Sequence, residues 1–119
     1  MLLIVGMALL VLWSMWQLQP DRMVRKGPNA WVGMRSPATV ASREAWAAAH
    51  RAAWPTARTG CILAIALLIA AAIFAIASSG LSQWEIGSLA LGAVTVVMLV
   101  TFLIAFRRAE RAAESVAAQ

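Results

Sequence analysis

The stretch "TARTGCILAIALLIAAAIFAIASSGLSQWEIGSLALGAVTVVMLVTFLIAF", residues 56–106, holds two apolar runs separated by a short polar turn. The runs, residues 56–79 and 83–106, are each long enough for the roughly 20 apolar residues that a membrane-spanning helix needs. Ser82 and Glu85 have the spacing of a capping box, which marks the start of a helix. The stretch therefore predicts two spanning helices joined by a tight hairpin.

A third apolar run lies upstream. Residues 2–19, "LLIVGMALLVLWSMWQLQ", carry no charge. We expect a retained spanning helix rather than a secretory signal peptide, because the run has no basic segment before it and no small-residue cleavage site after it. Gly80, directly after the second run, is typical of a helix C-cap.

The composition of the chain agrees with a membrane protein. Of 119 residues, 62% are hydrophobic and 13% are charged, with a mean hydropathy of +0.78. A soluble domain carries about 25% charged residues. We therefore predict an all-α integral membrane protein with three transmembrane helices, forming a single domain over residues 1–119.

The basic residues predict the orientation and one class of partner. The net charge is +5, and the segments 20–55 and 107–119 hold all the Lys and Arg residues except Arg58, which lies near the start of the second apolar run, whereas the hairpin holds none. The positive-inside rule predicts that both segments lie in the cytoplasm, with the N-terminus and the hairpin outside. Trp13 and Trp16 at the inner side and Trp84 at the outer side suit aromatic belts. Basic residues beside apolar runs favour anionic lipid headgroups, not nucleic acid, as a partner.

The sequence offers little catalytic chemistry. One Cys and one His exclude an internal disulfide and a zinc site, and no cofactor is expected. No ionisable residue lies deep within an apolar run, which argues against a pump or a proton-coupled transporter. Cys61 is interpreted as a small buried residue. The absence of a catalytic set predicts a non-enzymatic protein.

Small and neutral polar residues predict how the helices pack. Small residues let helix backbones approach closely, so they indicate either a seam within the bundle or a face for another protein. Neutral polar side chains are expected to bond to backbone or across helices. The first group is Ala66, Ala70, Ala71, Ala75, Ser88 and Gly92, and the second is Ser14, Gln17, Thr95 and Thr101.

The polar segment 20–55 does not fit a simple loop. Its turn residues in "KGPNAWVG" are followed by Ser36-Pro37, which predicts a helix start, and Pro55 should end or kink that helix. Within the helix, Trp46, His50 and Trp54 share one face, at spacings of four. We expect a cytoplasmic interfacial amphipathic helix that lies flat on the inner leaflet with its aromatic side toward lipid.

Individual side chains in this segment carry alternative interpretations. His50 is either a packed imidazole or a pH-sensitive group. Trp46 and Trp54 are interpreted as membrane-interface anchors rather than as ligand stackers. Arg35, between turn residues, is interpreted as a fixed donor to a carbonyl, a carboxylate or a lipid phosphate.

The same segment resembles the signature of the SdpI family. The resemblance rests on the order and spacing of Asn29, Gly33, Arg35, Pro37, Thr39, Ser42, Trp46 and His50, the last preceded by Ala49. Ser36 stands where the family usually has Thr, and the chain corresponds to a minimal three-span module of the longer immunity proteins. The three-span layout is similar too. The resemblance implies this fold and makes the eight residues the expected interaction site.

The resemblance also implies a function. The best-known member of the SdpI family is a bacterial immunity protein, which protects its cell from a secreted peptide toxin and holds a soluble repressor at the membrane. We therefore predict a non-enzymatic plasma-membrane protein that acts through its cytoplasmic loop on a cytosolic regulator. The alternative is a small accessory subunit of a larger membrane complex. An enzyme or transporter is the third and least supported hypothesis.

Overall fold

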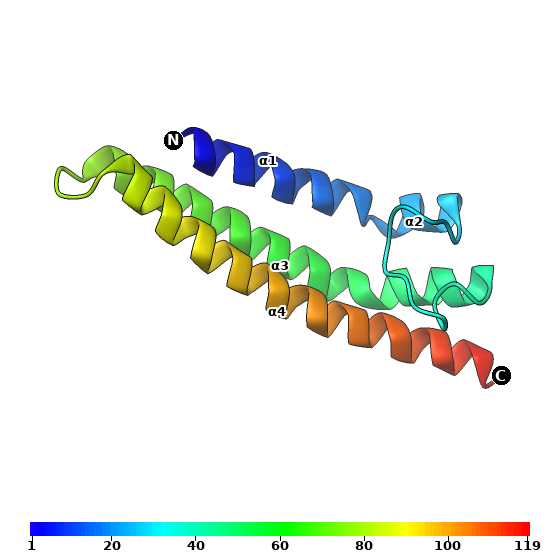
Figure 1. Cartoon of the computed structure of the whole chain (residues 1–119). Helices are drawn as coiled ribbons and strands as arrows, with labels where there is room; N and C mark the ends of the chain where they lie inside the picture. Colours follow the sequence, from blue (N-terminus) through cyan, green and yellow to red (C-terminus); the bar gives the residue numbers. More distant parts are fainter.

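The computed structural model describes residues 1–119 and contains four helices and no strand. In Figure 1, α3 (Arg43–Ala77) and α4 (Gln83–Ala117) run side by side as an antiparallel hairpin, and α1 (Leu2–Gln17) lies along them. The short α2 (Pro20–Lys26) follows α1 at a sharp bend. The bundle measures 60 × 21 × 19 Å, so it is far longer than the roughly 30 Å hydrocarbon core of a bilayer.

The structure confirms helices that can span a membrane, and it contains two or three such spans. By length and composition, α3 and α4 can each cross a membrane, whereas α1 qualifies only together with α2, across a 60° bend. The predicted span over residues 2–19 is therefore too long, since α1 ends at Gln17. The reason is Pro20, which disfavours helical geometry at the preceding Gln19, where φ is −56° and ψ is 130°.

The turn between α3 and α4 is built as predicted at one end only. The Ser82 hydroxyl accepts the Glu85 N–H at 3.2 Å, and the Glu85 carboxylate accepts the Ser82 N–H at 2.7 Å, which confirms the capping box. The prediction that Gly80 caps α3 is wrong. Ser78 is the C-cap and has extended backbone geometry, so no left-handed residue is needed.

Small residues form the seam between α3 and α4, but not the ones that were predicted. Ala66, Ala70, Ser88 and Gly92 are exposed. The buried small residues are Ala53, Ala57, Gly60, Cys61, Ala64 and Ala75 on α3, and Gly87, Ala90, Ala105, Ala109 and Ala113 on α4. Of the predicted small residues on α3 and α4, only Ala75 is therefore buried, and Ala71 is half-buried against the core. Cys61 is fully buried, as predicted.

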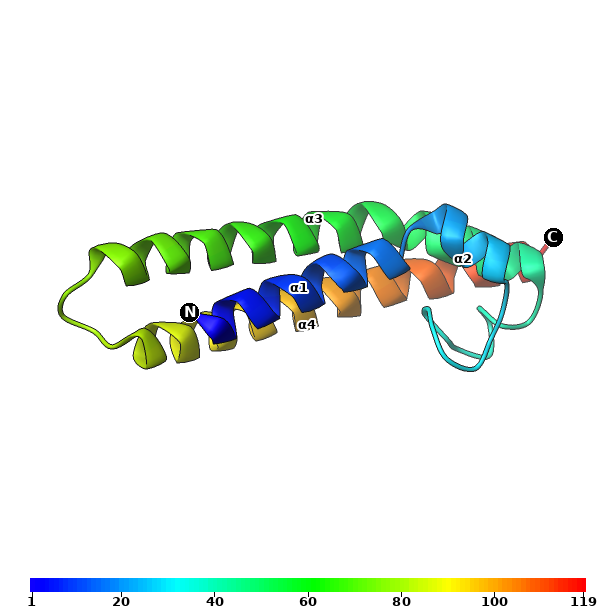
Figure 2. The same ribbon diagram turned by 90° about the horizontal axis from the view of Figure 1, so that it is seen from above.

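The core has two parts. In the first, α1 contributes Ile4, Met7 and Val11, which pack on Leu68 of α3 and Val94 of α4. Figure 2 shows α1 lying over the α3–α4 pair along this part. The second part is rich in alanine and joins Met34 and the first turns of α3 to the last turns of α4.

The helix α3 passes through Pro55 without a break. The predicted helix start at Pro37 is therefore wrong, since α3 begins at Arg43, and of the two alternatives for Pro55 the ending of the helix is wrong, since α3 continues to Ala77. Pro55 removes one N–H donor and disfavours a straight helix. Its ring lies on the exposed face, and on the opposite face Ala53 and Ala57 pack against α4, which keeps the helix continuous.

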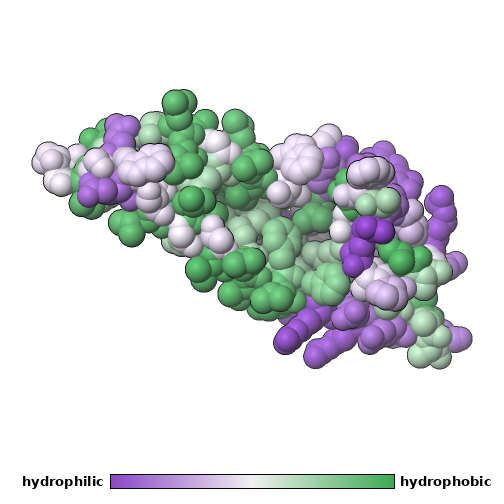
Figure 3. All heavy atoms as spheres, in the orientation of Figure 1, coloured by the Kyte–Doolittle hydropathy of each residue, from purple (hydrophilic) through white to green (hydrophobic).

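Hydrophilic residues gather at the end that holds α2 and the C-terminus, as Figure 3 shows. We call this the motif end: α2, residues 27–42, the first turns of α3 over residues 43–54, and the last turns of α4. The N-terminus lies at the opposite end, where the Met1 amino group donates to the Gln83 side chain at 3.3 Å. The polar loop and the basic tail thus share one end.

Candidate interaction site at the motif end

The motif loop, residues 27–42, begins with a turn that the Asn29 side chain shapes. The Asn29 amide donates to the Gly27 carbonyl at 3.0 Å. Its oxygen accepts the backbone N–H groups of Trp31 at 3.0 Å and Val32 at 2.9 Å. Gly27 itself ends α2 with a φ of 68°, which favours glycine. Asn29 therefore fixes a turn.

The loop backbone then lies directly on two rings of α3. Gly33 has a φ of 106°, and a Cβ built there would come within 2.7 Å of both His50 Nε2 and the Trp46 ring. The Trp46 and His50 rings themselves pack with centroids 4.2 Å apart. Glycine at position 33 is therefore required twice, by its backbone conformation and by the space above the rings.

Trp46 connects α3 to α2. Its side chain is fully buried. Its indole N–H donates to the Met23 carbonyl at 2.6 Å, the same carbonyl that accepts the Gly27 N–H at the end of α2. The interpretation of Trp46 as a membrane-interface anchor is therefore wrong, because its ring faces the protein and not lipid. Trp54, further along α3, is half-buried.

His50 is buried and held at both ring nitrogens. Nε2 accepts the Met34 N–H at 2.9 Å, and Nδ1 lies 2.9 Å from the Trp46 carbonyl. Because an amide can only donate and a carbonyl can only accept, these partners define a neutral ring with its proton on Nδ1. Burial lowers the pKa of His50, and the bond to the Trp46 carbonyl opposes that effect only in part. His50 is thus a packed imidazole that bonds the loop to α3.

The Thr39 side chain also fixes the backbone of the motif loop. Its hydroxyl is buried, accepts the Ser36 N–H at 2.7 Å and donates to the Met34 carbonyl at 2.9 Å. The backbone of Met34 is therefore bound on both sides, by His50 and by Thr39. Ser36 and Pro37 open only a single turn, closed by the bond from the Val40 N–H to the Ser36 carbonyl at 3.1 Å.

The true start of α3 lies further along the chain. Ser42 has extended backbone geometry, and its hydroxyl accepts the Ala45 N–H at 3.0 Å. Ser42 is the N-cap of the helix, whereas the sequence analysis predicted the helix start at Ser36-Pro37. Ser and Thr at this position satisfy an N–H that the helix leaves free.

The outer surface of the loop carries different residues. Arg35 is exposed, and its guanidinium donates to the Ala30 carbonyl at 3.1 Å, the first of the three acceptor classes expected for it. Pro37 is exposed as well. Trp31 is 91% exposed, more than any other tryptophan in the chain. The sequence analysis missed Trp31, although it is the one Trp within a run of turn residues.

The eight predicted residues therefore divide into two groups. Asn29, Gly33, Thr39, Ser42, Trp46 and His50 hold the motif loop against α3, whereas Arg35 and Pro37 lie on its surface beside Trp31. No group of three or more His, Cys, Asp or Glu side chains is placed to hold a metal ion. The arrangement is that of a loop whose backbone is fixed to α3 and whose outer face carries Trp31, Arg35 and Pro37.

A comparison with family models assigns the chain to a known protein family. The model of the SdpI/YfhL protein family matches residues 25–106. The chain belongs to the SdpI/YfhL protein family. The match covers the end of α2, the motif loop, all of α3 and most of α4, so it confirms the resemblance first seen in the motif.

The family membership also bears on the class of protein. The SdpI/YfhL family is a membrane protein family, which agrees with the long apolar helices α3 and α4. No curated protein and no solved structure matches the chain.

Proposed function

We propose that this protein is a non-enzymatic bacterial plasma-membrane protein of the SdpI type whose motif loop docks a soluble regulator. The membership of the SdpI/YfhL family supports an SdpI-like membrane protein. The immunity or signalling role follows from the resemblance to the best-known member, which holds a soluble repressor at the membrane. The basic residues at the motif end favour the cytoplasmic side for it, where such a regulator would be found.

One observation carries the proposal: a large aromatic side chain stands free on a loop whose backbone is fixed. Trp31 is 91% exposed, while its own N–H is bound by Asn29. Met34, three residues on, is bound by His50 and Thr39. Trp and Arg dominate the binding energy of protein interfaces, and a preformed loop loses little conformational entropy on binding. Trp31 and Arg35 are therefore the proposed contact residues.

The test is affinity purification at native expression level from the protein's own membranes, followed by mass spectrometry. We expect the wild type to retain a soluble DNA-binding regulator, and both Trp31→Ala and Arg35→Ala to lose it. Trp84→Ala is the matched control, since Trp84 is also exposed, at 74%, but lies at the opposite end of the bundle. Retention of the regulator by Trp31→Ala at equal protein level would contradict the proposal.

A specific observation also supports the second candidate, an accessory subunit of a larger membrane complex. Ala66 and Ala70 on α3, and Ser88 and Gly92 on α4, are small residues that face outward and are not used in the seam. Small residues on a lipid-facing surface allow another helix to pack closely. A stoichiometric large membrane partner that Trp31→Ala leaves in place would favour this candidate over the first.

A further inference from the structure

A second surface lies apart from the motif loop, in a groove between α3 and α4. The groove has a volume of about 390 Å³ and contains Pro55, Thr56, Thr59, Leu63, Thr101 and Arg108 among its lining residues. Sites for small ligands span roughly 300–1,000 Å³. The seam below it is tight, because a Cβ at Gly60 would overlap the Thr101 side chain.

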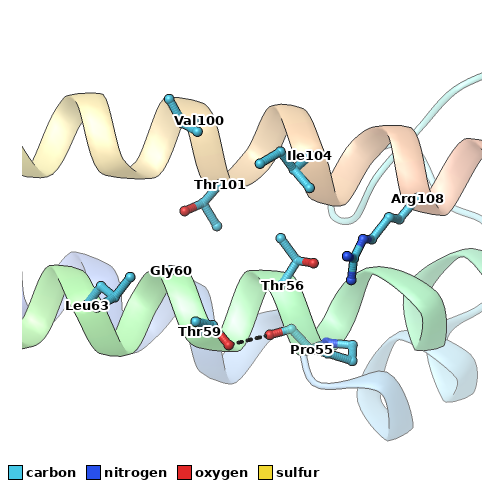
Figure 4. A pocket seen from close by; sticks show the side chains of 9 residues that line it. All are labelled: Pro55, Thr56, Thr59, Gly60, Leu63, Val100, Thr101, Ile104 and Arg108. Carbon is cyan, nitrogen blue, oxygen red and sulfur yellow. Dashed lines mark hydrogen bonds between the residues drawn. The ribbon is translucent and has the colours of Figure 1, made fainter.

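Three polar side chains that line this groove, Thr56, Thr101 and Arg108, make no hydrogen bond within the protein. Figure 4 shows Thr56, Thr101 and the Arg108 guanidinium directed into the space between the two helices. The Thr59 hydroxyl donates to the Pro55 carbonyl at 2.8 Å. By contrast, the hydroxyls of Thr56 and Thr101 make no hydrogen bond to a protein atom. Two free hydroxyls and one guanidinium thus face the same space.

The other side of the groove is apolar and exposed. Leu63 is 54% exposed, Val100 is 52% exposed and Ile104 is 45% exposed. These three side chains belong to the apolar runs of α3 and α4, whereas Arg108 is among the first charged residues after the run on α4. The groove therefore crosses the boundary between hydrocarbon and water, which is the depth of a lipid phosphate.

We propose that this groove binds one anionic phospholipid. The phosphate accepts hydrogen bonds from the Arg108 guanidinium and from the Thr56 hydroxyl, whereas Thr101, which is 8% exposed, lies below it against Gly60. The acyl chains pack along Leu63, Val100 and Ile104. Charge complementarity selects this occupant: a guanidinium binds a phosphate oxygen pair with two parallel hydrogen bonds, and the net charge of +5 favours an anionic headgroup. The proposal does not depend on the motif loop or on its partner.

The test is native mass spectrometry of the full chain released from nanodiscs that contain dioleoylphosphatidylglycerol or dioleoylphosphatidylcholine. We expect the wild type to retain one phosphatidylglycerol and no phosphatidylcholine. Arg108→Gln should weaken the retention about tenfold, as the loss of a charge-assisted bond to phosphate predicts. The control is Arg107→Gln, which removes the same charge one residue earlier on α4. Arg107 lies outside the groove, in a neighbouring hollow of about 210 Å³ that also contains Val100 and Ile104, and this variant should retain the lipid.

A second pair of variants tests the hydroxyls without changing the charge. Thr56→Val should weaken the retention several-fold, whereas Thr59→Val should not, because the Thr59 hydroxyl is already bonded to Pro55. Equal losses in Arg107→Gln and Arg108→Gln would overturn the proposal, and so would equal retention of the two lipids. Displacement of the lipid by inorganic phosphate would overturn it too, since the groove would then be a site for a soluble anion.

Discussion

The seam between α3 and α4 and the motif end are held together in different ways. In the seam, small residues such as Ala64, Ala90 and Gly60 bring two backbones together without a side-chain hydrogen bond between the helices. At the motif end, Trp46 and His50 bond to backbone atoms 23 and 16 residues away in the sequence. Lipid offers no hydrophobic drive for helix association, so the seam depends on close contact. The motif end depends on particular polar pairs.

The comparison teaches which part of the chain tolerates change. An alanine-rich seam can accept many small residues, because any of them lets the backbones approach. The buried polar groups at the motif end bond to particular backbone atoms, and removing one side chain leaves its partner unsatisfied. The four predictions that follow test this difference.

The largest effect is expected at Trp46. Trp46→Ala removes the largest fully buried side chain and its bond to Met23, and should lower the free energy of unfolding by about 3–5 kcal/mol. Trp84→Ala, on an exposed residue, should change it by less than about 0.5 kcal/mol. Unfolding in mixed detergent and dodecyl sulfate measures the free energy of unfolding of both variants. Equal losses would contradict the claim that the buried Trp46 stabilises the fold more than the exposed Trp84.

The next effect is expected at Gly33. Gly33→Ala combines a positive φ with a contact against Trp46 and His50, so we expect a loss of about 2–4 kcal/mol of stability. Gly92→Ala is the control within α4, where an added Cβ meets nothing within 4 Å and should be neutral or stabilising. A neutral Gly33→Ala would show that the loop does not rest on the rings.

The seam has its own test at Gly60. Gly60→Ala should cost about 1–3 kcal/mol of stability, because the added methyl group overlaps Thr101. The double variant Gly60→Ala, Thr101→Ala should recover most of the loss, and a double-mutant cycle measures that coupling. Failure of the second substitution to rescue the first would mean that backbone shifts, rather than this one contact, limit the seam.

The smallest effect is a dependence on pH through His50. Burial lowers the pKa of His50 below its usual 6.5, so below that pH the unfolded chain binds a proton that the folded chain does not. The free energy of unfolding should therefore fall as the pH falls through this window, by at most about 1.4 kcal/mol per pH unit, and level off below the folded-state pKa.

The control for the pH effect is His50→Gln, which removes the only histidine in the chain. Denaturation curves at about pH 7 and about pH 5 measure the slope for both proteins. We expect a flat profile for His50→Gln over this range. The same slope in both proteins would assign the effect to a different group.

Much of the fold could be predicted from the sequence. The length of the apolar runs predicted α3 and α4, and the pair Ser82 and Glu85 placed the start of α4, because both signals are local. The spacing of the motif from Asn29 to His50 predicted the family, which the comparison with family models confirmed. The local pattern failed at Pro55, where packing of the opposite face of α3 against α4 accompanies a continuous helix, and at Gly80, because α3 already ends at Ser78 with extended backbone geometry.

The sequence by itself determined that this is a helical membrane protein with a polar, basic segment of fixed residue spacing. Hydrophobic length, capping and turn chemistry act over a few residues, so they can be read along the chain. Only the tertiary structure decided that Trp46 and His50 face inward and that Trp31 faces outward. The physical reason is that the Gly33 backbone lies close to both rings and so holds the loop over α3. This contact joins residues that are distant in the sequence, so a local sequence pattern does not predict it.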